Sequence, residues 1–301
     1  MVPITLVTGF LGAGKTTLLS HVLSDPQGLG IAVLVNDFGA VNIDAELLQD
    51  AGEEIISLEN GCICCGLGQG LLATVTKVLR RPDPPDRLLI EASGVSDPFE
   101  IVETLSDPEL RDYAPLDGVV AVVDAEAMAH PGPEVVSLAR RQVACAGLVL
   151  LNKIDLAGTD ASARAWVRSV SAHVPIVETR QAAVALPTLL GIGASGDRRS
   201  DGCDVPAFES TVFTSTSPLS LQRLHDLLGT LPRGILRAKG VVNLVEKPSH
   251  RCLVQVSGGR ATLTVGRSWD GDIAQTRLVF IGLTGSVDAD AIRSQLEHVT
   301  A

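Results

Sequence analysis

The sequence has few of the features that mark membrane, secreted or nucleic-acid-coating proteins. Basic residues are outnumbered, with 24 Lys and Arg against 35 Asp and Glu, and the net charge is −11. This balance argues against nucleic acid or an anionic membrane as a partner. No apolar run approaches the roughly 18 residues of a membrane span, and the N-terminus lacks the basic and apolar regions of a signal peptide. We therefore expect a cytoplasmic protein whose six cysteines are ligands, nucleophiles or core residues rather than disulfides.

Aromatic residues are also scarce, at 3%, but 46% of the 301 residues are hydrophobic. That content supports folded cores and excludes a disordered chain, and the length predicts about two domains. Over residues 1–190, short apolar runs alternate with longer amphipathic stretches. The runs predict strands at Ile4–Thr8, Ile31–Asn36, Ile55–Leu58, Arg87–Glu91, Gly118–Asp124 and Leu148–Asn152, and the stretches predict helices at Lys15–Ser24, Gln69–Arg81, Pro98–Ser106, Pro133–Ala144 and Ala161–Ala172. This alternation predicts a doubly wound α/β domain with a mostly parallel sheet.

The alternation of strands and helices ends near residue 190. Residues 191–205 are rich in Gly, Ser and charge and predict a linker. Residues 206–301 predict a smaller α+β domain, because their strands are not interleaved with helices. The expected strands are Phe208–Thr214, Val241–Val245, Cys252–Val256, Ala261–Val265 and Arg277–Ile281, and the expected helices are Ser220–Leu228 and Asp288–His298.

A glycine-rich loop near the N-terminus predicts phosphate binding. Gly9–Thr16 fits the pattern G-x-x-x-x-G-K-[ST], follows a predicted strand and opens a predicted helix. Its glycines let the backbone N–H groups face phosphate oxygens, and the helix N-terminus adds partial positive charge. We expect Lys15 to reach the β- and γ-phosphates and the Thr16 hydroxyl to bind Mg²⁺. The predicted nucleotide-binding residues of this loop are Gly12, Ala13, Gly14, Lys15, Thr16 and Thr17.

A second nucleotide-binding pattern, Asn-Lys-Ile-Asp, ends the predicted strand Leu148–Asn152. The Asp155 carboxylate can accept hydrogen bonds from the N1–H and 2-amino groups of guanine, and adenine offers neither donor. Asn152 and Lys153 are expected to hold this loop and to cover the base. Together with the phosphate loop, the pattern predicts GTP as the nucleotide.

The predicted strand Arg87–Glu91 ends in an acid. In phosphate-loop NTPases an acid at this place, usually Asp, supports Mg²⁺, so we expect Glu91 to do so here. Gly94 follows closely enough to offer its backbone N–H to the γ-phosphate. An ordinary strand-end acid with a turn glycine is the alternative.

Three cysteines, Cys62, Cys64 and Cys65, follow the predicted strand Ile55–Leu58 and are flanked by glycines. Clustered thiolates are soft, anionic ligands suited to Zn²⁺ and, in principle, to Co²⁺ or Cu⁺. Three ligands leave one tetrahedral position open, as a transfer site needs. The carboxyl ends of parallel strands share one edge of a sheet, so we expect this loop near the γ-phosphate. A redox thiol pair and buried structural cysteines remain alternatives, and Cys145 and Cys252 are expected to be core residues.

Taken together, these motifs resemble the CobW-type metallochaperone GTPases, relatives of the nickel-insertion GTPases. The motifs that carry the resemblance are Gly9–Thr16, Asn36–Gly39, Glu59–Cys65, Glu91–Gly94 and Asn152–Asp155. The resemblance implies GTP hydrolysis with Mg²⁺ at Thr16 and Glu91, and Zn²⁺ or Co²⁺ on Cys62, Cys64 and Cys65. It also implies a client metalloprotein or metal-cofactor pathway enzyme as partner, and a GTP-dependent homodimer.

The resemblance further implies a switch at Asn36–Asp44, where Asp37 or Asp44 orients the attacking water or helps to hold metal. The family usually has Glu at the position of Asp37. Many members carry a His-rich linker, whereas Gly191–Gly202 contains no His, which argues against metal storage in this segment. Two other function classes stay open at this point: a small-molecule phosphotransferase, and a signalling GTPase with a structural zinc.

Overall fold

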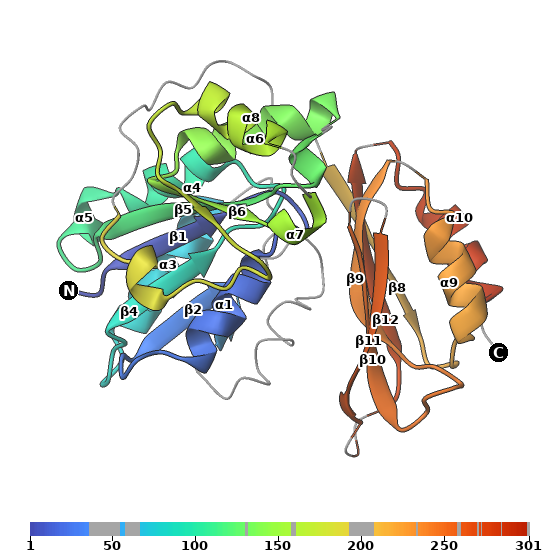
Figure 1. Ribbon diagram of the computed structural model, residues 1–301. Coiled ribbons are helices and arrows are strands. Elements are labelled where there is room, and N and C mark those ends of the chain that lie inside the picture. Colours follow the sequence, from blue (N-terminus) through green and yellow to red (C-terminus); the bar gives the residue numbers. More distant parts are fainter. Residues whose placement is uncertain are drawn as a thin grey trace. The chain divides into compact units, whose positions relative to one another are not determined.

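A computed structural model describes residues 1–35, 55–57, 67–129, 132–157, 161–192, 208–232, 234–257, 260–269, 271, 273–283 and 285–299. The chain divides into two compact units, and the described residues up to 192 belong to the first and those from 208 to the second. Figure 1 shows a helix-covered parallel sheet in the first unit and a separate sheet with its own helices in the second.

The first unit is built on a seven-stranded sheet in the order β3-β2-β4-β1-β5-β6-β7. All of its strand pairs are parallel. The strands are β1 (Ile4–Thr8), β2 (Ile31–Val35), β3 (Ile55–Ser57), β4 (Arg87–Glu91), β5 (Leu116–Asp124), β6 (Leu148–Asn152) and β7 (Ile176–Glu178). The strand order places β1 in the middle of the sheet, which brings the loop after it next to the ends of β4 and β5.

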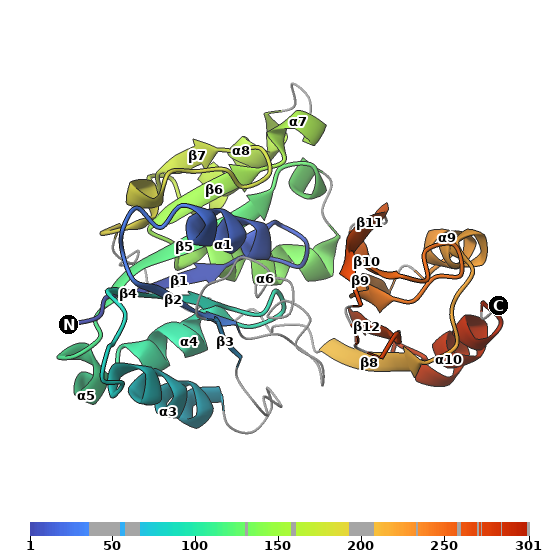
Figure 2. The ribbon, with the colours of Figure 1, turned by 90° about the horizontal axis from the view of Figure 1, so that it is seen from below.

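Apolar side chains alternate between the two faces of this sheet and form two cores. On β1, Ile4 and Leu6 join one core and Val7 joins the other. Helices α3 (Leu67–Leu79), α4 (Pro98–Leu105), α6 (Pro133–Ala144) and α8 (Ser162–Val170) pack in the first core, and α1 (Lys15–Ser24) and the 3-10 turn η2 (Leu186–Leu189) pack in the second. Figure 2 shows α1 on one side of the sheet and α3 and α4 on the other. Because both faces are covered, the strands are mostly apolar, as parallel strands usually are.

This architecture confirms the predicted doubly wound α/β fold. The six predicted strands and five predicted helices of this region are present, with ends that differ by a few residues. The structure adds elements that the sequence analysis did not predict: β7, α5 (Pro108–Arg111), α7 (Ile154–Ala157), η1 (Ala127–Ala129) and η2. All of these are short, so a periodic pattern has little length in which to show itself.

The second unit holds a five-stranded antiparallel sheet in the order β11-β10-β9-β12-β8. Its strands are β8 (Phe208–Ser215), β9 (Ile235–Val242), β10 (His250–Ser257), β11 (Arg260–Ser268) and β12 (Thr276–Leu283), and its helices are α9 (Leu221–Gly229) and α10 (Ala289–Glu297). Leu224 of α9, Leu296 of α10 and Phe280 of β12 share one core, so the helices cover one face of the sheet.

One predicted strand of this unit is wrong in its bounds. The sequence analysis placed a strand at Val241–Val245, whereas β9 runs from Ile235 to Val242. Arg237 and Lys239 are buried in this strand, at 5% and 6% exposure, and their charges hide its first half from a hydrophobicity pattern.

In the described part of the chain, no helix is long and apolar enough to cross a membrane.

Candidate nucleotide and magnesium site

The chemically active motifs of the first unit leave its sheet at one edge. Because all the strands are parallel, their carboxyl ends point the same way. Val7 of β1 is in register with Glu91 of β4, and Asp124 of β5 is in register with Asn152 of β6. The phosphate loop and the strand-end acid therefore follow the adjacent strands β1 and β4, and the predicted base-recognition loop follows β6, which β5 separates from β1.

The phosphate loop has a backbone shape that only glycine accepts. Gly9, Gly12 and Gly14 all have positive φ, at 138°, 75° and 112°. A Cβ on Gly9 would lie 2.2 Å from the Val122 carbonyl oxygen, and one on Gly14 would lie 2.4 Å from the Asn152 Nδ2 atom. Side chains at these positions would thus clash with the neighbouring strand ends as well as strain the backbone. Gly14 is also the N-cap of α1, so the helix N-terminus opens at this loop, as an anion site requires.

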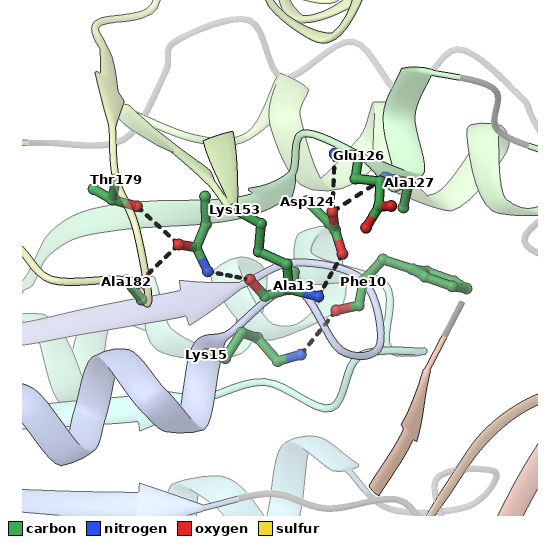
Figure 3. Close-up of polar contacts among 10 residues, drawn as sticks. Phe10, Ala13, Lys15, Asp124, Glu126, Ala127, Lys153, Thr179 and Ala182 are labelled. Carbon is green, nitrogen blue, oxygen red and sulfur yellow. Dashed lines mark hydrogen bonds and ion pairs between the residues drawn. The ribbon is translucent and has the colours of Figure 1, made fainter. Parts of the chain in front are cut away.

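Lys15 is held inside the phosphate loop. Its side chain is 3% exposed, and its Nζ atom donates to the carbonyl oxygens of Gly9 at 2.9 Å and of Phe10 at 3.3 Å. The bond to Phe10 is drawn in Figure 3. A buried ammonium needs such acceptors, and phosphate oxygens are stronger acceptors than carbonyls because they are charged. The ammonium is therefore already placed at the mouth of an anion site.

The side chains of Thr16 and Glu91 form a pair of oxygen ligands suited to Mg²⁺. The Thr16 Oγ1 atom donates to the Glu91 Oε1 atom at 3.0 Å. Glu91 is 3% exposed and Thr16 is half-buried. A hydroxyl and a carboxylate are hard oxygen ligands of the kind Mg²⁺ prefers, and Mg²⁺ is usually held by one or two such side chains plus phosphate oxygens and water. The residues present therefore fit the ion.

Gly94 lies against the phosphate loop. It is buried, and a Cβ added to it would meet the Leu11 Cδ2, N and Cα atoms at 2.6, 2.8 and 2.9 Å. Only glycine lets the two backbones approach this closely. The segment after β4 is consequently within reach of whatever the phosphate loop holds.

Asn152 connects the base-recognition loop with the phosphate loop. It is 2% exposed, and its Nδ2 atom donates to the Ala13 carbonyl oxygen at 2.8 Å. Its Oδ1 atom accepts from Thr179 Oγ1 at 3.1 Å and from the Ala182 N–H at 2.7 Å. Figure 3 shows these three bonds converging on one side chain. Asn152 thus holds three loops in fixed positions, since all of its hydrogen bonds are buried.

Lys153 and Asp155 differ from Asn152 in their surroundings. Lys153 has a left-handed backbone, with φ of 61°, and its Nζ atom pairs with the Asp124 Oδ2 atom at 2.6 Å. The Asp124 Oδ1 atom accepts from the backbone N–H groups of Glu126 and Ala127 (Figure 3). Asp155, in α7, is exposed. Its carboxylate is therefore open to solvent, where a guanine base can meet it.

Three residues of this site were missed from the sequence. They are Asp124, which pairs with Lys153, and Thr179 and Ala182, which bind Asn152. The only available signal for Asp124 was an acid at the end of an apolar run, like Glu91. Thr179 and Ala182 follow a three-residue strand that no pattern revealed.

Several predicted site residues lie outside the described residues: Asp37, Cys62, Cys64, Cys65 and the rest of the switch Asn36–Asp44. In the part of the chain that the structure describes, no group of three His, Cys, Asp or Glu side chains could hold a metal ion.

Cys145 and Cys252 are buried, as predicted, at 3% and 0% exposure. Burial, with a smaller contribution from Asp97, raises the pKa of the Cys145 thiol to about 12, and burial also raises the pKa of the Cys252 thiol.

A phosphate loop, a strand-end acid and an Asn-Lys-x-Asp loop on a doubly wound parallel sheet define a P-loop GTPase. The chain belongs to the CobW/HypB/UreG family: residues 3–178 match the model of the CobW/HypB/UreG nucleotide-binding domain. Residues 208–300 match the cobalamin synthesis protein cobW C-terminal domain. The two matches cover most of both units.

Among characterised relatives, the zinc chaperone CobW of Pseudomonas aeruginosa is 35% identical over 99% of this chain and 92% of its own length. The zinc-regulated GTPase metalloprotein activator 1 of Dictyostelium discoideum is 28% identical over 90% of this chain and 69% of its own. The crystal structure of the Zn(II)-bound YjiA GTPase from Escherichia coli is 26% identical over 100% of this chain and 99% of that one, with a TM-score of 0.48.

Proposed function

We propose that this protein is a GTP-dependent zinc metallochaperone. It binds zinc on Cys62, Cys64 and Cys65, hydrolyses GTP with Mg²⁺ held by Thr16 and Glu91, and passes the metal to a client metalloprotein. The names of its relatives support the zinc part: one is a zinc chaperone and another a zinc-regulated metalloprotein activator. The contact between Thr16 and Glu91 supports the Mg²⁺ part.

The observation that carries the coupling between nucleotide and metal is the direction of β3. Ser57, the last residue of β3, is in register with Val35 of β2, which is in register with Glu91. Ser57, the last described residue before the cysteine segment, therefore lies at the same edge and the same level of the sheet as Glu91. Parallel strands that leave one edge place their following loops around a common site.

The length of the cysteine segment is compatible with this coupling. Strands β2 and β4 separate β3 from β1, so three strand spacings of roughly 4.8 Å put the two strand ends about 14 Å apart. At roughly 3.3 Å per residue, the chain can span about 16 Å from Ser57 to Cys62 and about 26 Å from Ser57 to Cys65. The thiols can thus approach the terminal phosphate without any rearrangement of the sheet.

The chemistry of the cysteines favours zinc as the cargo. Thiolates are soft ligands that select Zn²⁺ over Mg²⁺ and Ca²⁺, and cobalt fits the same ligands. Three of them leave a fourth coordination position for a client's ligand. GTP binding would gather the thiols, and loss of the γ-phosphate would release them, because a ligand shifts a two-state equilibrium toward the state it binds more tightly.

The test is zinc affinity in two nucleotide states. Purified protein is titrated against a graded chelator with Mg²⁺ and either a non-hydrolysable GTP analogue or GDP, and bound zinc is measured by elemental analysis. We expect tighter zinc binding with the analogue. Cys64→Ala should weaken zinc binding and leave nucleotide binding almost unchanged. Equal zinc affinities in the two states would overturn the coupling.

A further inference from the structure

Helix α6 carries a glutamine where its pattern calls for an apolar residue. Leu138 and Ala139 are buried on the inner side of α6, at 0% and 5% exposure, and Gln142 follows them at the i+4 and i+3 positions. Gln142 is itself 1% exposed. Residues with this spacing share one face of a helix, so the Gln142 amide is buried among apolar neighbours.

Among the described residues, one end of the Gln142 amide has a hydrogen-bond partner and the other has none. The Gln142 Nε2 atom donates to the Gly94 carbonyl oxygen at 3.3 Å, and within the described residues the Gln142 Oε1 atom is buried without a hydrogen bond. Burying a polar atom unpaired costs stability. An apolar side chain of the same length, such as Met, would fill the position without that cost. Packing therefore does not explain Gln142, and its bond to Gly94 is the feature that distinguishes it.

The preceding residue of α6 holds the same segment at its other end. The Arg141 Nε atom donates to the Asp97 Oδ2 atom at 3.0 Å, and the Arg141 Nη2 atom donates to the same oxygen. Asp97 is the N-cap of α4 and accepts from the Phe99 N–H at 3.0 Å. The Arg141 guanidinium also lies over the Phe99 ring, 5.0 Å from its centroid. Both ion-pair partners are largely buried, with side-chain exposures of 14% and 12%, which limits screening by solvent.

The segment from Gly94 to Asp97 therefore lies between two supports. On one side Gly94 packs against Leu11 of the phosphate loop. On the other side Gln142 and Arg141 hold both of its ends. Gln142 also lines a cavity of about 20 Å³ together with Phe10 and Leu11, so α6 borders the same cavity as the phosphate loop.

We propose that Gln142 and Arg141 are positioning residues, which hold the segment from Gly94 to Asp97 against the phosphate loop so that the Gly94 N–H faces the terminal phosphate of GTP. This inference rests on the GTPase part of the proposed function and is independent of zinc. Gly94 can distinguish GTP from GDP only if its backbone is held at a fixed distance from the phosphate loop. Since GDP has no terminal phosphate, the two residues act on GTP alone.

The test compares affinities for a non-hydrolysable GTP analogue and for GDP in Gln142→Met. We expect the analogue to bind about fivefold more weakly, in line with the loss of one buried hydrogen bond, and GDP affinity to change by less than about twofold. Hydrolysis at saturating GTP should fall as well. Val143→Ala is the matched control, because Val143 is buried in the first-unit core and is the neighbour of Gln142 in the same helix.

Arg141→Lys is the second variant and keeps the positive charge beside Asp97. It should weaken binding of the GTP analogue, but by less than Gln142→Met does. The binding weakens because Lys cannot donate two hydrogen bonds in a fixed fork. Parallel losses of analogue and GDP affinity would overturn the proposal. The proposal would also be overturned if these variants, like Val143→Ala, only lowered the melting temperature and left the ratio of analogue affinity to GDP affinity unchanged. Zinc binding could prove independent of nucleotide while the variants still lower the affinity for the GTP analogue relative to that for GDP. That result would support this inference and contradict only the zinc coupling.

Discussion

The side-chain amide of Asn152 joins the base-recognition loop to the phosphate loop, because its Nδ2 atom donates to the Ala13 carbonyl oxygen at 2.8 Å. The other end of the amide accepts from Thr179 and Ala182. One buried side chain thus sets the spacing between the loops that are predicted to bind the base and the phosphates. A site with a fixed spacing loses little conformational entropy when nucleotide binds.

Replacing the Asn152 amide should weaken the binding of GTP and of GDP equally. In Asn152→Asp the acceptor for Thr179 and Ala182 is kept, but a carboxylate oxygen faces the Ala13 carbonyl and the donor is lost. We expect affinity for GTP and GDP to fall by about tenfold or more, and the free energy of unfolding to fall by about 1–3 kcal/mol. Calorimetric nucleotide titration and urea denaturation measure the two effects.

Thr179→Val is the control for Asn152, because it removes one hydrogen bond to the amide oxygen and leaves the bond to Ala13 in place. It should lower stability by about 1 kcal/mol and affect nucleotide affinity less than Asn152→Asp does. A selective loss of GTP with normal GDP binding in Asn152→Asp would contradict this role.

Glu91 should control the response to Mg²⁺. Glu91→Gln preserves the shape of the side chain but removes the charge beside Thr16, so the Mg²⁺ concentration needed for half-maximal hydrolysis should rise by about tenfold or more. Nucleotide affinity without Mg²⁺ should change little. Glu91→Asp keeps the charge on a shorter side chain, so it should raise this Mg²⁺ concentration less than Glu91→Gln does. A normal Mg²⁺ response in Glu91→Gln would exclude Glu91 as a ligand or support of the ion.

The predicted guanine contact of Asp155 can be tested by exchanging donors and acceptors. Xanthine carries a carbonyl where guanine carries its 2-amino group, so Asp155→Asn replaces an acceptor by a donor that suits xanthine. The ratio of GTP to XTP affinity should shift toward XTP by about a hundredfold. Competition with a fluorescent nucleotide measures this ratio. If Asp155→Asn left the ratio unchanged, another residue would read the base.

The sequence was sufficient to predict the strands and helices of the first unit where they are long and periodic. Its apolar runs are those of strands covered on both faces, and the glycines of the phosphate loop have the positive φ values that its pattern requires. The contacts among the loops could not be predicted. The pair of Lys153 with Asp124 joins the loop after β6 to the end of β5, and the bond from Gln142 to Gly94 crosses between a helix and a loop. Such contacts depend on how the helices pack on the sheet, which local pattern does not encode.

Buried thiols make cysteine reactivity a selective probe of the proposed zinc ligands. Burial raises the pKa of the Cys145 thiol to about 12, so almost no thiolate forms on it at pH 8, and burial lowers the thiolate fraction of Cys252 because it also raises that pKa. In native protein we expect both to resist alkylation, whereas Cys62, Cys64 and Cys65 react without metal and are protected by zinc with a GTP analogue. Mass spectrometry of the alkylated peptides separates the sites. Alkylation of Cys145 in folded protein at pH 8 would contradict its burial.

The raised pKa of the Cys145 thiol also predicts how stability depends on pH. The pKa of this thiol rises from 9.0 to about 12, so above pH 9 the unfolded chain releases a proton that the folded chain retains. Its contribution to stability is therefore complete below pH 9 and is lost as the pH rises toward 12. Cys145→Ala removes this titration, so the free energy of unfolding should fall less steeply between pH 9 and 11 than in the unsubstituted protein. Denaturant unfolding at several pH values measures both slopes, and equal slopes would show that the thiol titrates alike in the folded and unfolded chain.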